Sequence, residues 1–344
     1  MPGNGFQCSD FNNMPRSYKT LIKWSKFVAK FKEYALKVYT NIEDFKDVRN
    51  PIVTTGTFDG VHLGHQKIIS RLKDAAKNED GETVLLTFYP HPRMVLFPDD
   101  NELKLLNTQE EKIKLLENYG VDHLIIYPFT KEFSRLTSVE FVRNILVNRI
   151  KTKRLVIGYN HHFGRNREGS FEHLKEYGPL YGFEVEEIPA KDIDHVEVSS
   201  TKIRKALQEG DVKIAADYLG HPYSLTGKVV AGKQLGRTIG YPTANIVVED
   251  KYKLIPADGV YAVRVEHKGQ LFGGMLNIGN NPTIAGKGRS IEVNIFDFDK
   301  DIYGDDATIY FIKRLRDELK FNNLEELKSA LAKDKENSLA ILGK

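Results

Sequence analysis

The pattern of predicted secondary structure changes once along this chain of 344 residues, close to Gly210. Before that point, short apolar segments of strand composition alternate with segments of helical periodicity. After it, short strands bounded by Gly and Pro follow one another. Alternating strands and helices predict a parallel sheet with helices on both faces. Closely spaced strands predict a β-sandwich or β-barrel. The sequence therefore predicts an α/β domain followed by an all-β domain.

The predicted elements divide accordingly. Strands are expected at 51–57, 83–88, 123–128 and 154–158, and helices at 66–77, 110–119, 138–148 and 171–181. A helix at 212–219 leads into strands at 228–231, 260–266, 273–278, 291–296 and 307–314, and a helix at 323–332 closes the chain. Ligands of a parallel sheet bind beyond the carboxyl ends of its strands, so the active site of the first domain is expected there.

Composition excludes several classes of protein. With 41% hydrophobic and 28% charged residues the chain can bury ordinary cores, and a net charge of +3 gives no case for nucleic-acid binding. No apolar run approaches the roughly 18 residues of a membrane helix, and no signal peptide is recognisable. The single cysteine, Cys8, excludes an internal disulfide and fits a reducing cytoplasm. The composition leaves the oligomeric state open.

The first 36 residues stand apart from this pattern. Residues 1–17 are rich in Asn, Gly, Ser and Pro and are predicted to be disordered, whereas residues 18–36 form a basic amphipathic stretch. Such a helix could bind a membrane surface or a partner. It could equally cover core surface, or be an extension translated from a misassigned start. Intact-mass analysis of the native protein would settle where the native chain begins.

A first candidate phosphate site is the turn at residues 56–65, GTFDGVHLGH. It follows a predicted strand and opens a predicted helix, whose first amides and dipole attract a phosphate. Glycines in the turn let the backbone approach a ligand. His62 and His65 can donate hydrogen bonds to phosphoryl oxygens as charge develops. Alternatively, the two histidines only cap the helix.

A second candidate lies far downstream, at residues 199–204, SSTKIR. Ser199, Ser200 and Thr201 lie at a predicted helix start, and Arg204 follows one turn later, which makes another anion cradle. Caps of this type are routine and usually structural. Two such cradles in one sheet domain are much harder to explain as caps alone.

A third candidate lies in the β part, at residues 240–245, GYPTAN. Pro242 fixes a turn, and Thr243 and Asn245, two residues apart, face the same side of an extended segment. A hydroxyl and a carboxamide oxygen suit Mg²⁺ bound to phosphates. The glycines around this motif are Gly232, Gly236 and Gly240. Taken alone, the string is an ordinary loop.

The pairing of the first two motifs resembles the HxGH nucleotidyltransferases, and within them the adenylyltransferase domain of prokaryotic FAD synthetases. Residues 87–93, TFYPHPR, and 163–169, FGRNREG, resemble two further motifs of that family. The resemblance implies a Rossmann-like domain in which FMN attacks the α-phosphorus of ATP and pyrophosphate leaves. Where the family usually carries an Asp-Phe-Arg-like triplet, this chain has residues 160–162, NHH.

The resemblance also implies roles for individual residues. His62 and His65 would stabilise the transition state. ATP and its phosphates would contact Gly56, Phe58, Asp59, Gly64, Ser199, Ser200, Thr201 and Arg204. The flavin would contact Phe88, Pro90, Asn160 and Phe163.

The C-terminal part resembles the riboflavin kinases over residues 223–344, through the stretches 227–232, 256–263, 277–283 and 291–304 together with the GYPTAN motif. This implies a β-barrel with a terminal helix. Gly232, Gly236, Gly240, Pro242, Thr243 and Asn245 would bind ATP and magnesium, with Thr243 and Asn245 as the metal ligands. Glu292 would accept the proton of the riboflavin 5′-hydroxyl.

The strand at residues 291–295 is compatible with this role for Glu292. Alternation along a strand puts its apolar residues on one face and leaves Glu292 and Asn294 on the other. A solvated strand face would show the same pattern. Family members often have His in place of Asn294, for which we expect a modest change in binding.

Together these observations predict a bifunctional enzyme with ATP, riboflavin and FMN as substrates and Mg²⁺ as cofactor. The expected division is an extension at 1–36, an adenylyltransferase domain at 37–210, a linker helix at 211–222 and a kinase domain at 223–344. Three alternatives stay open. One is a single nucleotidyltransferase with a regulatory flavin-binding β domain, and another is a flavin-binding protein without activity. The third, a class I aminoacyl-tRNA synthetase, is disfavoured by the missing KMSKS-type partner motif.

Overall fold

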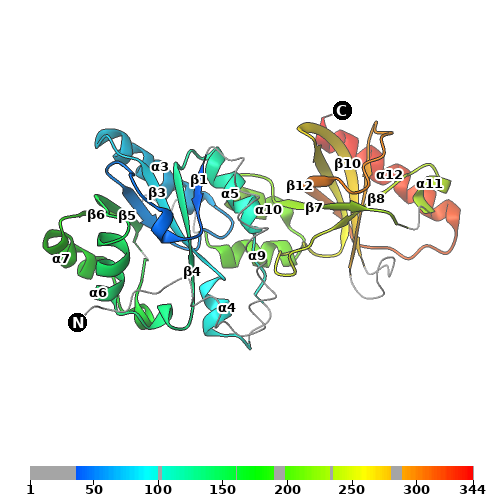
Figure 1. The fold of residues 1–344 in the computed structure, drawn as a ribbon. Helices are drawn as coiled ribbons and strands as arrows, with labels where there is room; N and C mark the ends of the chain where they lie inside the picture. The colour runs from blue at the N-terminus through cyan, green and yellow to red at the C-terminus, as the bar shows by residue number, and fades with distance from the viewer. Residues whose placement is uncertain are drawn as a thin grey trace.

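The computed structural model describes residues 36–99, 103–159, 161–189, 198–232, 235–279 and 289–343. The predicted extension, apart from Leu36, lies outside the described residues, as do Asn160 and residues 280–283 of a kinase-like stretch. Figure 1 shows two lobes, a sheet with helices and a β-barrel, with helices α9 (Ser200–Gln208) and α10 (Val212–Leu219) between them. The predicted change of fold class is confirmed.

The N-terminal lobe is built on a parallel sheet of six strands in the order β1-β4-β3-β2-β5-β6. The strands are β1 (Lys37–Tyr39), β2 (Ile52–Thr55), β3 (Thr83–Tyr89), β4 (His123–Pro128), β5 (Arg154–Gly158) and β6 (Glu184–Ile188). β1 and β6, the two edge strands, were not predicted from the sequence. β1 is very short, and β6 carries Glu at three of its five positions, so neither has the apolar run of a central strand.

Helices cover both faces of this sheet, as predicted. Val84 and Leu86 of β3 pack with a helical segment at 138–147 and with α7, whereas Leu85 packs with α3 and α5 on the opposite face. The helices are α3 (Leu63–Asn78), α4 (Pro92–Leu96), α5 (Gln109–Asn118), α6 (Ser138–Phe141) continuing as the π-helix η5 (Val142–Val147), and α7 (Phe171–Tyr181). Short 3-10 turns lie at η3 (Ile42–Asp44), η4 (Phe133–Arg135) and η6 (Arg165–Arg167). Alternate residues of each central strand are thus buried on opposite sides.

The C-terminal lobe is a closed barrel in the order β10-β11-β8-β7-β12-β9. Its strands are β7 (Ser224–Val230), β8 (Ala244–Val247), β9 (Gly259–His267), β10 (Gln270–Gly279), β11 (Ser290–Ile295) and β12 (Asp306–Arg316), with α11 (Leu235–Thr238) between β7 and β8. The terminal helix α12 (Leu324–Leu342) extends ten residues past its predicted end. β8 was not predicted as a strand because it has only four residues and directly follows the GYPTAN turn.

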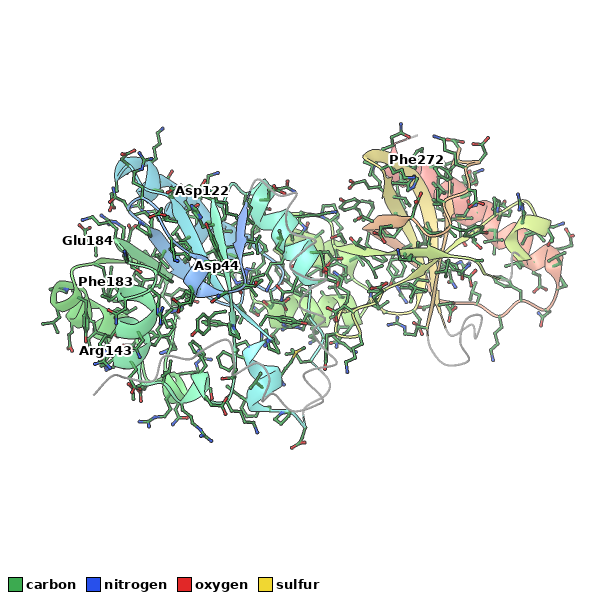
Figure 2. All side chains as sticks on the ribbon, in the orientation of Figure 1. Asp44, Asp122, Arg143, Phe183, Glu184 and Phe272 are labelled. Atoms are coloured by element: carbon green, nitrogen blue, oxygen red, sulfur yellow. The ribbon has the colours of Figure 1, made fainter. Side chains whose placement is uncertain are left out.

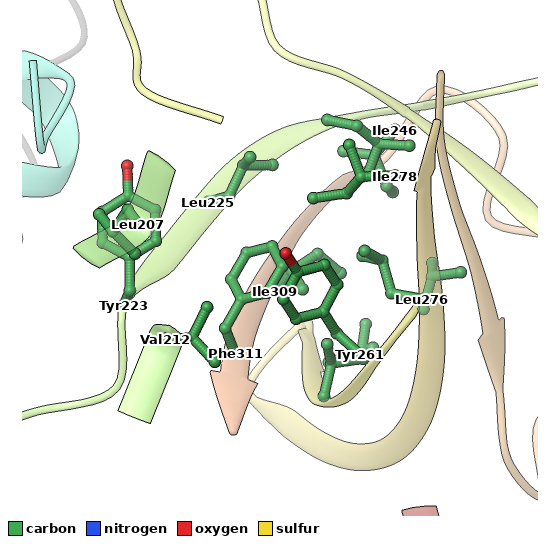
Figure 3. Packing of buried hydrophobic residues seen from close by; sticks show 14 of the residues in the cluster. Leu207, Val212, Tyr223, Leu225, Ile246, Tyr261, Leu276, Ile278, Ile309 and Phe311 are labelled. Carbon is green, nitrogen blue, oxygen red and sulfur yellow. The ribbon is translucent and has the colours of Figure 1, made fainter. Parts of the chain in front are cut away.

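One hydrophobic core runs from the barrel into the linking helices. Leu207 of α9 and Val212 of α10 belong to the same buried cluster as Leu225, Ile309 and Phe311 of the barrel, as Figure 3 shows. The labelled Phe183 and Phe272 in Figure 2 lie in separate lobes, and Phe183 is buried beneath α7 whereas Phe272 flanks the barrel cluster. The expected boundary near Tyr223 therefore falls inside a shared core, and the division of the chain into domains stays a prediction. Among the described residues, no helix combines the length and apolar character that crossing a bilayer requires.

Two candidate active sites

The turn after β2 places the first motif at the carboxyl end of the sheet. Its backbone is unusual, because Phe58 and Val61 adopt positive φ angles of 46° and 42° alongside Gly60 at 88°. A β-branched residue such as Val61 rarely takes this conformation, and strained backbone of this kind concentrates at functional turns. A side chain on Gly60 would lie 2.7 Å from Leu106. The turn is thus held in one specific shape.

His62 and His65 stack at the start of α3, with ring centroids 3.7 Å apart. His62 is the N-cap, and its Nδ1 accepts a hydrogen bond from the His65 amide at 3.4 Å, which leaves the proton on Nε2. Burial lowers the pKa of His62 to about 4 and that of His65 well below its usual value. Both imidazoles are therefore neutral at pH 7. The capping interpretation holds for His62, and it leaves the Nε2–H available as a donor.

Asp59 connects the two phosphate-site motifs. Its buried carboxylate pairs with Arg204 Nη2 at 2.6 Å through Oδ2. Oδ1 accepts the amides of Leu106 at 2.9 Å and Asn107 at 3.4 Å. Because Asp59 and Arg204 are 145 positions apart, this pair brings together segments that the sequence shows only as separate motifs. The carboxylate of Asp59 thus organises the protein around the turn, and its predicted contact with ATP stays a prediction.

The hydroxyl residues of the second motif differ in what they contact. Ser199 caps α9 by accepting from the Lys202 amide, and Ser200 Oγ donates to the Asp59 carbonyl at 2.9 Å. Thr201 is exposed beside them. Phe58 is buried in the core against His65, which leaves its backbone as the part that could meet a ligand. The two motifs meet at the carboxyl end of the sheet, as the sequence predicted.

Two further groups, Lys112 and His91, surround this turn; the sequence did not point to Lys112, and His91 was noted only as part of the TFYPHPR motif. Lys112 of α5 is buried and donates to the Thr57 carbonyl at 2.9 Å, and burial lowers its pKa to about 8. Burial also lowers the pKa of His91 to about 4, with the nearby Asp59 acting in the opposite direction. Lys112 was missed because a Lys on an amphipathic helix ordinarily faces water.

The predicted flavin residues lie among aromatic side chains. Phe88 is 5.7 Å from the Phe129 ring and 5.6 Å from the Phe133 ring, and Phe163 is 5.7 Å from the Phe141 ring. Phe133 and Phe141 are 6.1 Å apart, which makes the group continuous. Pro90 is buried at the end of β3. The structure thus groups Phe88 and Phe163, and it adds Phe129 and Phe133, which carried no motif.

The second site lies on the barrel, where β8 pairs with β11. Asn245 stands directly opposite Glu292 in the antiparallel register, and Asn277 of β10 stands opposite Glu292 on its other side. Ile291, Val293 and Ile295 are in the barrel core. The predicted alternation along this strand is confirmed, and it places Glu292 on the face that carries Asn294.

Glycines shape the surroundings of Asn245. Its buried amide packs so closely on Gly232 that a side chain there would lie 2.1 Å from Nδ2. A side chain on Gly236 would lie 2.2 Å from the Tyr241 carbonyl, and Gly240 has a φ of +86° that favours glycine. Asn245, held in this way, and Thr243, near Gly236, carry neutral oxygens of the kind that bind Mg²⁺, and their role as metal ligands stays a prediction.

Asn294 fixes the loop that precedes β8. Its Nδ2 donates to the Pro242 carbonyl at 2.7 Å, and the residue is buried. Sequence reasoning noted Asn294 only as a departure from the family and missed this contact. The carboxamide therefore joins β11, which carries Glu292, to the turn that carries Thr243.

Comparison with known proteins decides the family. A family model described as FAD synthetase matches residues 44–202, and one described as riboflavin kinase matches residues 219–342. The chain is 39% identical to the bifunctional riboflavin kinase/FMN adenylyltransferase of Listeria monocytogenes, covering 88% of this chain and 95% of that protein. The chain belongs to the bifunctional riboflavin kinase/FMN adenylyltransferase family.

A second relative carries the same description, and a solved structure with a different description shares the architecture. The Escherichia coli K12 protein of the same description is 36% identical over 82% of this chain and 90% of its own length. Among solved structures, a chain described as a macrolide-efflux protein from Streptococcus pneumoniae matches with a TM-score of 0.80 and 36% identity, covering 88% of this chain and 98% of that one. The architecture therefore extends over both lobes of a solved relative.

Proposed function

We propose that this chain makes both flavin cofactors in sequence. The barrel phosphorylates riboflavin with ATP to give FMN, and the N-terminal domain transfers AMP from ATP to FMN, giving FAD and pyrophosphate. The chain is a bifunctional riboflavin kinase and FMN adenylyltransferase, and the observation that carries this is the match of both family models to one chain. Both matches favour this reading over a single nucleotidyltransferase with a regulatory β domain. A cytoplasmic location is part of the proposal.

In the N-terminal domain, catalysis is proposed to rest on positioning and electrostatics. The FMN phosphate attacks the α-phosphorus of ATP in line, and the bond to pyrophosphate breaks without a covalent enzyme intermediate. Neutral His62 donates from Nε2–H, because its Nδ1 is occupied by the His65 amide. A neutral donor in a buried turn stabilises charge that develops in the transition state.

Arg204 is proposed to serve the phosphates while anchored to the protein. Its Nη2 binds Asp59 and its Nε binds the Lys104 carbonyl at 2.7 Å. Because guanidinium carries five donors in a rigid fork, two anchored nitrogens fix where the third, Nη1, can meet a phosphate oxygen. Ser199, Ser200 and Thr201 would add hydroxyl and amide donors at the start of α9.

In the barrel, Glu292 is proposed to accept the proton of the riboflavin 5′-hydroxyl as the oxygen attacks the γ-phosphorus of ATP. Thr243 and Asn245 would hold Mg²⁺, which neutralises phosphate charge when bound. The register that sets Asn245 opposite Glu292 supports placing the proton acceptor beside the phosphates. Gly232 and Gly236 keep side chains out of this space.

A chromatographic product assay tests the proposal. Purified protein is incubated with riboflavin, ATP and Mg²⁺, with the flavin oxidised or reduced. FMN should appear first and FAD after a lag, with ADP and pyrophosphate released. FMN without FAD would reject the adenylyltransferase, and neither product would favour a flavin-binding protein without activity.

A further inference from the structure

A short segment before α5, residues 104–108, lies between the two lobes, and we call it the strap. On the side that faces the N-terminal lobe, the strap contacts the turn at residues 56–65, which we call the adenylyltransferase turn. The Leu106 and Asn107 amides donate to Asp59, and the Lys104 carbonyl accepts from Arg204 Nε at 2.7 Å. The Asp59–Arg204 pair is therefore held by the backbone of the strap as well as by its own charges.

On its other side the strap pairs with the connection between β8 and β9 of the barrel. The Leu105 amide donates to the Tyr252 carbonyl at 2.6 Å, and the Leu105 carbonyl accepts from the Leu254 amide at 2.8 Å. Lys104 Nζ also donates to the Lys251 carbonyl at 2.8 Å. These bonds make a one-residue parallel bridge between the lobes. The strap can move only if the barrel connection moves with it.

Lys253 lies at the centre of this bridge and is buried. Its Nζ donates to the Leu106 carbonyl at 2.7 Å, to Glu111 Oε2 at 2.6 Å and to the Ser224 carbonyl at 2.7 Å. All three protons of the ammonium are thereby satisfied. The acceptors come from the strap, from α5 and from β7, so a single cation joins both lobes.

Glu111 completes the arrangement from α5. Its carboxylate accepts from the Thr108 amide at the end of the strap at 3.0 Å, and from the Thr226 amide of β7 at 2.9 Å. The next residue, Lys112, binds the Thr57 carbonyl in the adenylyltransferase turn. Neighbouring residues of one helix turn therefore contact the barrel and the N-terminal site.

We propose that Lys253, a residue of the kinase lobe, is a positioning residue for FMN adenylylation. Through the Leu106 carbonyl and Glu111 it fixes the strap, and the strap's amides fix Asp59 and with it Arg204. The inference rests on the proposed adenylyltransferase function. It assigns Lys253 no role in riboflavin phosphorylation, because the three acceptors of its ammonium group lie on the strap, on α5 and at the start of β7.

Lys253 and Glu111 form a buried ion pair. Removal of one of its two charges should disturb the strap more than removal of both. Lys253→Met leaves the Glu111 carboxylate buried without its cation, and an unpaired buried charge forces its surroundings to rearrange. Glu111→Gln combined with Lys253→Met leaves a neutral side chain whose one carbonyl oxygen can accept either the Thr108 or the Thr226 amide, so it loses one hydrogen bond but leaves no unpaired buried charge. The double variant should therefore be the more active of the two.

The test compares Lys253→Met, the double variant and Lys205→Met, which breaks an exposed pair with Glu209 on α9. For Lys253→Met we expect kcat for FAD formation from FMN to fall about tenfold or more, because small displacements of positioned groups are costly. KM for FMN and the rate of riboflavin phosphorylation should stay within about twofold of the wild type. The double variant should regain part of the lost kcat, and Lys205→Met should match the wild type.

Three outcomes would overturn the inference: FAD formation by Lys253→Met within about twofold of the wild type, equal losses of both activities, or a double variant no better than the single one. If Lys253→Met does not fold, the double variant is compared with the Lys205→Met control instead. The inference then requires that the double variant has a lower kcat for FAD formation than the control and an unchanged rate of FMN formation. Wild-type protein that makes no FAD would reject the proposed function instead, so the two failures are distinguishable.

Discussion

The two sites of this enzyme are assembled by different physical means. In the N-terminal site, segments about 145 residues apart meet through the Asp59–Arg204 ion pair and the hydrogen bond from Ser200 to the Asp59 backbone. In the barrel site, Asn245 and Glu292 face each other because β8 and β11 are paired in register. The N-terminal site is therefore held by polar contacts between a loop and the start of a helix. The barrel site is held by the pairing of strands whose inner face forms the barrel core.

This difference predicts how each site responds to change. A strand register is fixed by every apolar residue on the buried face, so the geometry of the barrel site should survive the loss of a single polar side chain even where the chemistry does not. A site joined by one buried ion pair should respond sharply to the loss of either partner. Substitutions that test the two sites separately can break or sharpen this comparison.

The largest effect is expected for Glu292→Gln. Loss of a general base typically lowers a rate by about 10²–10⁴-fold, so FMN formation should fall in that range. Because the amide is isosteric, the β8–β11 register and the folded state should persist. The measurement is the initial rate of FMN formation from riboflavin. The matched control is Glu325→Gln on the exposed surface of α12. If Glu292→Gln formed FMN at a rate near that of the control, Glu292 would not be the general base.

The next effect is expected for Asp59→Asn, which leaves the Arg204 guanidinium without its carboxylate. Breaking a largely buried pair typically costs about 3–5 kcal/mol of folding free energy, so the melting temperature should fall. FAD formation should drop by about 10²-fold as Arg204 shifts, while FMN formation remains. Denaturant unfolding and both product assays check this, with the exposed Asp217→Asn on α10 as the control. Unchanged FAD formation would contradict the organising role of Asp59.

A smaller effect is expected for Gly232→Ala. The added methyl group would lie 2.1 Å from Asn245 Nδ2, so the carboxamide must move. Displacement of a proposed Mg²⁺ ligand should reduce FMN formation by about tenfold and raise the Mg²⁺ concentration needed for half-maximal rate. The control is Gly269→Asn, where no atom lies within 4 Å of an added Cβ and Asn tolerates the positive φ. An equal dependence of the rate on Mg²⁺ concentration in the wild type and the variant would contradict the proposed role of Asn245 as a metal ligand.

The last effect, which acts on stability at acidic pH rather than on either rate, concerns protonation at the N-terminal site. Burial lowers the pKa of His62 from 6.5 to about 4, so between pH 4 and 6.5 the unfolded chain binds a proton that the folded chain does not. Stability should therefore rise with pH across this window, by about 3 kcal/mol from this group, and level off above it. NMR titration of the imidazole should give a midpoint near 4, and His62→Gln should flatten the slope. A midpoint near 6.5 would mean that the ring is solvated.

Much of the fold could be predicted from the sequence. Central strands such as β3 and β4 are continuous apolar runs, and the amphipathic helices between them have clear periodicity, so their positions were predicted to within a few residues. β1, β6 and β8 were missed because their pairing is decided by neighbouring strands rather than by their own composition. The meeting of the two N-terminal motifs followed from the rule for parallel sheets.

What the sequence did not show is which groups hold the sites in place. Lys112 and Lys253 have the residue type of a solvated surface, yet both are buried because the tertiary fold places carbonyls or a carboxylate around their ammonium groups. The contact of Asp59 with Arg204 is likewise set by the packing of α9 against the strap. Asn294 was noted only as a departure, whereas its hydrogen bond to Pro242 depends on where the GYPTAN turn lies. Such contacts depend on three-dimensional proximity, which no local pattern encodes.

The most direct test of two independent sites in one chain is to assay Glu292→Gln and Asp59→Asn with each substrate in turn. Given FMN and ATP, Glu292→Gln should make FAD at the wild-type rate, and given riboflavin and ATP, Asp59→Asn should make FMN and largely stop there. Each folded variant would then lose one reaction and keep the other. If either folded variant lost both reactions, the assignment of separate chemistry to the turn after β2 and to the β8–β11 pair would be wrong.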